Sequence, residues 1–170
     1  PESRYVAQRE FRFRHTLMRE AAYCLLTDED RVLGHRLAGM YLEQQGELDP
    51  AILAEHAHRG NDPQRALPHY IRAAEQALVG NNISAALHYA RAGLAYAPTG
   101  EARGLFYSIE GTANLWGGEL QAARTACLQA LELLTRGSTS WFRSILSLWM
   151  TTIYLGQTEL FDSLRDQFRN

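Results

Sequence analysis

The sequence predicts an all-α fold, a solenoid of antiparallel helical hairpins, and three observations support it. The chain is rich in alanine and contains only 5 prolines, and alanine is the strongest helix former. Short turns built from Gly, Asn or Pro recur at roughly regular intervals. Small residues recur at fixed distances after several of these turns, where paired helices would approach each other closely.

The first third of the chain should contain a short strand and two helices. Apolar and basic residues alternate over residues 11–14, which favours a strand, and apolar residues at helical spacing predict a helix over residues 15–26. Thr27 and the three acidic residues after it predict the start of the next helix, because a hydroxyl caps free N–H groups and carboxylates favour the positive end of the helix dipole. That helix should end near Gly46.

From Asp49 onward, turns separate segments of helical length. They lie at residues 59–63, 80–82, 98–100, 116–118, 136–138 and 155–157, roughly 18 to 20 residues apart. Short connections force neighbouring helices to run antiparallel, so we expect about nine helices in the whole chain, arranged as hairpins.

The sequences that follow three of these turns resemble one another, at residues 61–67, 81–87 and 118–124. Each places an alanine five residues after the turn residue and another small residue seven positions later. The alanines are Ala66, Ala86 and Ala123, and the later small residues are Ala73, Gly93 and Ala130. Helix pairs advance by about 37 residues, and a period of that size with two helices per unit indicates a solenoid.

This pattern resembles the tetratricopeptide repeat. Ala86, Tyr89, Gly93 and Pro98 match that family's small, aromatic, small and closing-proline positions in order, and Gly111, Gly118, Ala123 and Ala130 match the next unit. The resemblance covers about residues 51–168. It implies a right-handed superhelix in which the first helix of each pair lines a concave, partner-binding face.

A second resemblance concerns residues 11–23, together with Arg31, His35 and Leu37. This stretch resembles part of the signal-transduction ATPases with numerous domains, large bacterial proteins in which it joins a winged-helix end to helical repeats. Such proteins are often fused to Ser/Thr kinases, nucleotide cyclases or DNA-binding output domains. The resemblance implies a cytoplasmic regulatory module, with residues 1–48 as the linker and residues 49–170 as the repeats. We expect a segment of a longer protein, because the chain begins at Pro1 and its last predicted helix reaches Asn170.

Composition argues against several classes of function. The formal net charge of −2 does not suit nucleic acid, whose binders carry basic stripes. All 17 basic residues are arginine, so this segment has no lysine for a Walker loop, a kinase strand or a Schiff base. No apolar run reaches membrane-spanning length, and no signal peptide opens the sequence.

Candidates for chemistry are weak. His56 and His58 would lie about 200° apart on a helix and could not chelate one ion, and neither a zinc-protease HExxH motif nor a Gly-x-Ser-x-Gly elbow is present. We therefore expect no catalytic residue, no metal and no cofactor. Cys24 and Cys127 should be buried core thiols in a reducing compartment.

The repeat register predicts a partner-binding face. Most aromatic residues of the second half should pack between helices, but Trp116 lies beside two glycines at a turn and should face the partner. The residues expected on the concave face are Arg72, Glu75, Thr112, Trp116, Arg143 and Met150. Arginine, tryptophan and methionine are common in such linings.

We therefore expect a non-catalytic scaffold of a bacterial signalling protein that binds a protein, a peptide or a neighbouring domain. The alternative is a small-ligand sensor or enzyme, in which His and Tyr side chains line a pocket inside the superhelix. A structural spacer without a partner is a third possibility.

The fold class leads to a direct spectroscopic prediction. Far-ultraviolet circular dichroism of the chain should show the double minimum of a mainly helical protein. A strand-rich spectrum would contradict the predicted fold.

Overall fold

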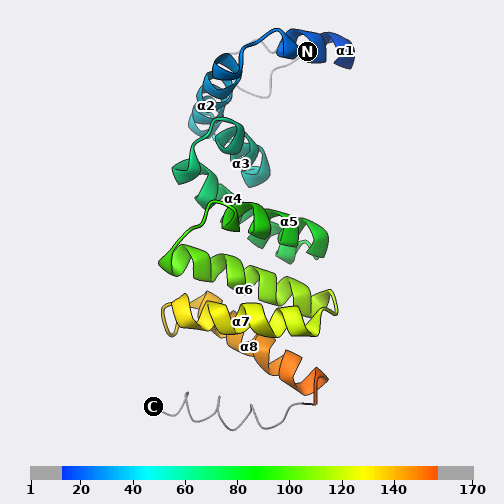
Figure 1. Cartoon of the computed structure of the whole chain (residues 1–170), viewed down its shortest axis with the longest axis vertical. Coiled ribbons are helices and arrows are strands. Elements are labelled where there is room, and N and C mark those ends of the chain that lie inside the picture. The colour runs from blue at the N-terminus through cyan, green and yellow to red at the C-terminus, as the bar shows by residue number, and fades with distance from the viewer. Residues whose placement is uncertain (1–12, 157–170) are drawn as a thin grey trace. The chain divides into compact units, whose positions relative to one another are not determined.

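The computed structural model describes residues 13–156 and confirms an all-α fold. The described residues contain eight helices and no strand (Figure 1). The helices are α1 (Thr16–Cys24), α2 (Asp28–Gln44), α3 (Pro50–Arg59), α4 (Pro63–Val79), α5 (Ile83–Leu94), α6 (Gly100–Trp116), α7 (Leu120–Leu133) and α8 (Thr139–Tyr154). The ninth predicted helix, after the turn at 155–157, lies outside the described residues.

The strand expected at residues 11–14 is not present at its described positions. Phe13 and Arg14 are irregular, while Phe11 and Arg12 lie outside the described residues. Between residues 13 and 156 there is no other strand with which this segment could pair. A strand needs such a neighbour, because its backbone N–H and C=O groups require partners.

The chain divides into two compact units, residues 1–66 and 67–170, and the boundary falls within α4. In the first unit, α2 packs against α3. The start of α2 is as predicted: Thr27 Oγ1 accepts a hydrogen bond from the Asp30 N–H at 3.1 Å, and three acidic residues occupy the first turn. Arg36 on α2 donates two hydrogen bonds, at 3.0 and 3.3 Å, to the carbonyl of Gly60 at the end of α3. The division predicted at residues 48 and 49 came from a family resemblance and stays a prediction.

In the second unit the helices pack in chain order. Helix α5 packs on α6, α6 on α7 and α7 on α8, and α6 also contacts α8 (Figure 1). Each turn between helices α4 to α8 contains a residue in the left-handed region, among them Asn81 (φ 55°) and Gly118 (φ 82°). Asparagine and glycine adopt this conformation at low cost, and it reverses the chain direction within a few residues. The predicted turns at these positions are confirmed.

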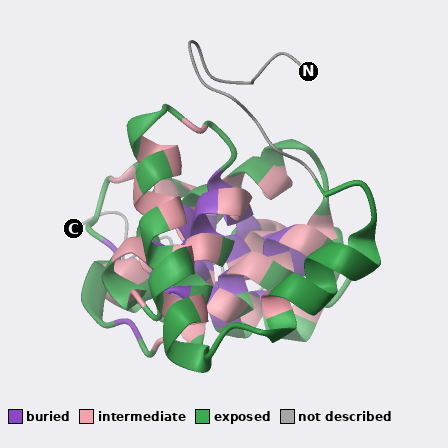
Figure 2. Cartoon of the chain, turned by 90° about the horizontal axis from the view of Figure 1, so that it is seen from above, coloured by how far each residue is buried: buried purple, intermediate pink, exposed green. Residues whose placement is uncertain are grey.

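Small residues allow the helices of this unit to approach closely. Ala86 and Ala123, both expected at helix crossings, are fully buried. A Cβ atom built on Gly93 would lie 2.1 Å from the Phe106 ring, and one on Gly111 would lie 2.5 Å from Cys127 Sγ. Figure 2 shows the buried residues on the inward sides of the helices, with exposed residues outside. Close approach at small residues therefore sets the packing of α5, α6 and α7.

Overpacking one crossing should destabilise the chain. Ala123→Leu would insert three carbon atoms between α6 and α7, which typically costs about 1–3 kcal/mol. The neighbouring Ala122 is exposed, so Ala122→Leu makes a matched control that should change little. Urea unfolding should give a lower midpoint for Ala123→Leu than for Ala122→Leu. Equal midpoints would mean that α7 does not present Ala123 to α6.

Candidate functional site

A cluster of hydroxyl groups joins α6 to α8 in the second unit. Ser108 on α6 and Ser144 on α8 are both buried, and Ser144 Oγ lies 2.9 Å from Ser108 Oγ and 2.8 Å from the Ser140 carbonyl. Ser108 Oγ also lies 3.1 Å from that carbonyl. These bonds satisfy polar groups that would be costly to bury without partners.

Arg143 extends this cluster towards the surface. Its Nε donates to Ser108 Oγ at 3.1 Å, and both terminal nitrogens lie 3.5 Å from Glu75 Oε1 on α4. The Arg143 side chain is 25% exposed and the Glu75 side chain 40% exposed. A long, partly solvated ion pair contributes little to stability. Its main effect is to hold the guanidinium in one place with part of it accessible.

Thr112 continues the cluster along α6. Its Oγ1 donates to the Ser108 carbonyl at 2.9 Å and lies 3.0 Å from Ser147 Oγ on α8. A hydroxyl has a single proton. Because Thr112 gives its proton to the carbonyl, it accepts the proton of Ser147.

The structure thus brings three of the six predicted site residues into one network. Glu75 and Thr112 each connect to Arg143 through direct or Ser108-mediated contacts. No hydrogen bond or ion pair found among residues 13–156 joins the other three to it: Arg72 is exposed on α4, Trp116 is 62% exposed at the end of α6, and Met150 is half-buried on α8. Their role at a partner-binding face stays a prediction.

The sequence analysis missed the serines that connect these residues. Ser140, Ser144, Ser147 and Thr151 follow one another at spacings of three or four along α8, so they share one helix face. That spacing was visible in the sequence. Hydroxyl residues give no hydrophobic periodicity, so this spacing does not mark a buried helix face as apolar residues do.

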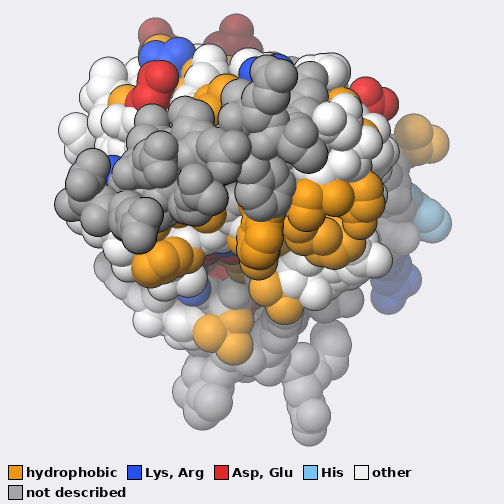
Figure 3. Space-filling model, turned by 90° about the horizontal axis from the view of Figure 1, so that it is seen from below, with side chains coloured by type: hydrophobic (Ala, Val, Ile, Leu, Met, Phe, Trp, Pro, Cys, Tyr) orange, Lys and Arg blue, Asp and Glu red, His pale blue; other side chains and the backbone are white. Residues whose placement is uncertain are grey.

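The expectation that most aromatic residues of the second half pack between helices is wrong for residues of α8. Phe106 is fully buried as expected, but Phe142 is 58% exposed and Tyr154 is 63% exposed. Leu146 and Ile153 are also more than half exposed on α8. Figure 3, seen from the α8 end, shows hydrophobic side chains gathered on this face. Helix α8 thus buries Ser144, Ser147, Thr151 and Thr152 together with Leu148, while several of its larger apolar residues are exposed.

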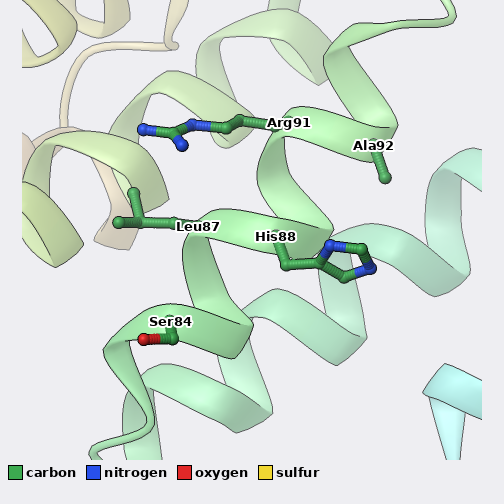
Figure 4. Close-up of a pocket in the computed structure, with 5 residues that line it drawn as sticks. All are labelled: Ser84, Leu87, His88, Arg91 and Ala92. Carbon is green, nitrogen blue, oxygen red and sulfur yellow. The ribbon is translucent and has the colours of Figure 1, made fainter.

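A depression of about 560 Å³ lies along α5 (Figure 4). Its lining residues all come from that one helix: Ser84, Leu87, His88, Arg91 and Ala92. In Figure 4 the Arg91 and His88 side chains point in different directions, and Arg91 Nε lies 3.4 Å from Glu110 Oε1. The polar groups do not converge on one point, as a small-ligand site requires.

The histidines and cysteines differ in environment. His56 lies against His35 of α2, whereas His58 is exposed. Within the described residues, no group of three or more His, Cys, Asp or Glu side chains could hold a metal ion. Burial raises the pKa of the Cys127 thiol to about 12, so it is not a thiolate near neutral pH.

The expectation that both cysteines are core residues is wrong for Cys24, which is exposed. It ends α1, a helix with no buried residue. The apolar residues of α1 therefore do not form a buried face of that helix.

Across the described helices, none is both long enough and apolar enough to cross a membrane.

The hydroxyl cluster should contribute to stability. Ser144→Ala would remove a buried hydroxyl that bonds to two partners, which costs about 1–3 kcal/mol where partners stay buried. Thr125 on α7 makes the same kind of bond to the carbonyl four residues earlier, but it is exposed. Thr125→Ala should therefore change the free energy of unfolding much less. Similar losses for both variants, measured by urea unfolding, would contradict a stabilising role for the cluster.

Comparisons with known proteins identify no relative. No protein-family model matches the sequence, and neither a curated protein nor a solved structure gives a significant match. The described residues form eight helices, with α2 packed on α3 in the first unit and α5 to α8 packed in chain order in the second.

Proposed function

We propose that the chain is a non-catalytic interaction module, a right-handed solenoid of repeats similar to tetratricopeptide repeats. Its place would be in a multidomain bacterial signalling protein of the cytoplasm. The support for the repeat is structural and internal. Turns at Asn81 and Gly118 each contain a left-handed residue. Helices α5 and α6 pack closely at Gly93, α6 and α7 pack closely at Gly111, and Ala86 and Ala123 are fully buried.

The contact between α6 and α8 supports the same proposal. These helices are not consecutive, yet they pack together while each also contacts α7. In a row of hairpins, alternate helices lie on one side and form a continuous face. Here that face would be formed by α4, α6 and α8, which carry all six residues of the predicted binding face.

The observation that carries the binding proposal is the geometry of Arg143. Arg143 lies on α8, and its guanidinium is held by Ser108 and Glu75. A quarter of the side chain nevertheless remains exposed. An arginine held in one orientation loses less conformational entropy when it binds. Because arginine and tryptophan often dominate protein interfaces, Arg143 and the exposed Trp116 are the residues we assign to partner contact.

The ligand would be a protein, a peptide or another domain of the same protein. A small-ligand sensor or an enzyme would need polar groups that converge in an enclosed pocket. The depression along α5 lacks that convergence. It therefore gives the sensor alternative little support.

Site-specific crosslinking tests this function. A photoreactive phenylalanine analogue would replace Arg72 on the proposed face or Leu128 on α7, which is 37% exposed. We expect position 72 to crosslink one defined partner in the source cell, and position 128 to give none. Trp116→Ala should reduce that crosslink several-fold, because it removes the largest exposed side chain at the end of α6, while Leu128→Ala should not.

The outcome of this experiment also decides between the alternatives. Equal crosslinking from both positions would mean that the partner does not bind selectively to the face formed by α4, α6 and α8. If neither position gave a crosslink and deletion of residues 67–170 left the output of the full-length protein unchanged, the chain would be a spacer.

A further inference from the structure

Three side chains of the first unit connect α1, α2 and α3. The Tyr23 hydroxyl on α1 lies 3.0 Å from His35 Nε2 on α2. The other nitrogen of that ring, Nδ1, lies 3.2 Å from His56 Nδ1 on α3. The two imidazole rings have centroids 5.1 Å apart. Gly39 makes room for this contact, because a Cβ atom there would lie 3.2 Å from His56 Cβ.

The contact between the two histidines limits how many protons they can hold. A hydrogen bond between two nitrogens needs one proton between them. The neutral pair meets this condition, with one Nδ1 donating and the other accepting. A pair with one extra proton also meets it, because the extra proton occupies an outer nitrogen. A second extra proton would place N–H groups on both Nδ1 atoms, which would then repel each other.

The surrounding groups disfavour positive charge on His35. Among the described residues, the charged or titratable groups acting on the pair are Tyr23 from α1 and Glu55 and Arg59 from α3, while Arg31 of α2 lies across the Tyr23 ring. Glu55 and Arg59 also form an ion pair with each other. Partial burial, then His56 and Arg59, lower the pKa of His35, with Glu55 opposing. Partial burial lowers the pKa of His56, against opposing effects of Glu55 and the contact with His35.

We propose that His35 and His56 form a pH-sensitive clasp that holds α3 against α2 when at most one extra proton is bound, and opens when both rings are charged. Besides this pair, α2 and α3 are joined by the hydrogen bonds of Arg36 to the Gly60 carbonyl, and few side chains of the first unit are buried. Neither α1 nor α2 has a buried residue, and the buried side chains of α3 are small or few: Pro50, Leu53, Ala54 and Ala57.

The direction of the pH dependence follows from the pKa values. Both are lower in the folded chain than the ordinary value of 6.5. Below that pH the unfolded chain therefore binds more protons than the folded one. The stabilising contribution is complete above pH 6.5 and decreases as the pH falls through 6.5 towards the pKa values of the folded pair.

Hydrogen exchange on the 170-residue chain tests the clasp. Amide protection would be measured at pH 7.5 and pH 5.0, corrected for intrinsic exchange, with α6 as an internal reference. We expect protection of α3 relative to α6 to be lost in part at the lower pH, because the folded pair takes up protons less readily than the unfolded chain does. His56→Asn keeps a hydrogen-bonding group near the Nδ1 position but does not titrate, so the fall should disappear. His88→Asn, at an exposed histidine on α5, should keep it.

A second measurement does not depend on the fold of a variant. Titration of the wild-type imidazole signals by NMR should show His35 and His56 taking up protons in two coupled steps, the second accompanied by loss of α3 protection. Independent titration of the two rings near pH 6.5 would overturn the proposal. So would an undiminished pH response in His56→Asn, or a gain in α3 protection with one equivalent of Zn²⁺, since the pair would then be a metal site.

Discussion

Close approach of helices at small residues is the constraint on which the second unit depends. Gly93 lies against the Phe106 ring and Gly111 lies against Cys127, at distances that leave no space for a Cβ atom. Ala86 and Ala123 are likewise fully buried. Large side chains at these positions would separate the backbones, and the contact between α6 and α8 depends on α7 being close to both. Helices α5 to α8 therefore pack in the order in which they follow one another along the chain.

The close approach of the helices also determines which side chains are exposed. Because α8 meets α6 through serines and a threonine, several of its large apolar residues, among them Phe142 and Leu146, are exposed, although Leu148 is fully buried. The buried hydroxyls need partners, and they obtain them from carbonyls within α8 and from Ser108 across the interface. Arg143 takes part in this network from its edge, which fixes an arginine at a partly exposed position. The partner-binding face that we propose is therefore a consequence of how the helices pack.

Sequence reasoning identified the features that depend on local chemistry. Thr27 marks the start of α2, and Asn81 and Gly118 mark turns, because caps and left-handed residues act over a few neighbouring positions. The repeat register also grouped Glu75, Thr112 and Arg143, which one hydrogen-bond network joins; that they line a partner-binding face stays a prediction. Features that depend on distant partners were missed or wrong. His35 and His56 are 21 residues apart, and the exposure of Cys24 and Phe142 depends on which neighbouring helix covers each face.

The reactivity of the two native thiols tests the central claim about close packing without any substitution. Cys24 is exposed, whereas Cys127 is fully buried against Gly111 and has a raised pKa. A thiol-specific reagent added in excess to the native chain should therefore react rapidly with one equivalent, located at Cys24 by peptide mapping. Cys127 should react only at the rate at which α6 and α7 separate, and rapidly in denaturant. Rapid reaction of Cys127 in the native chain would contradict close packing at this crossing and the arrangement of helices built on it.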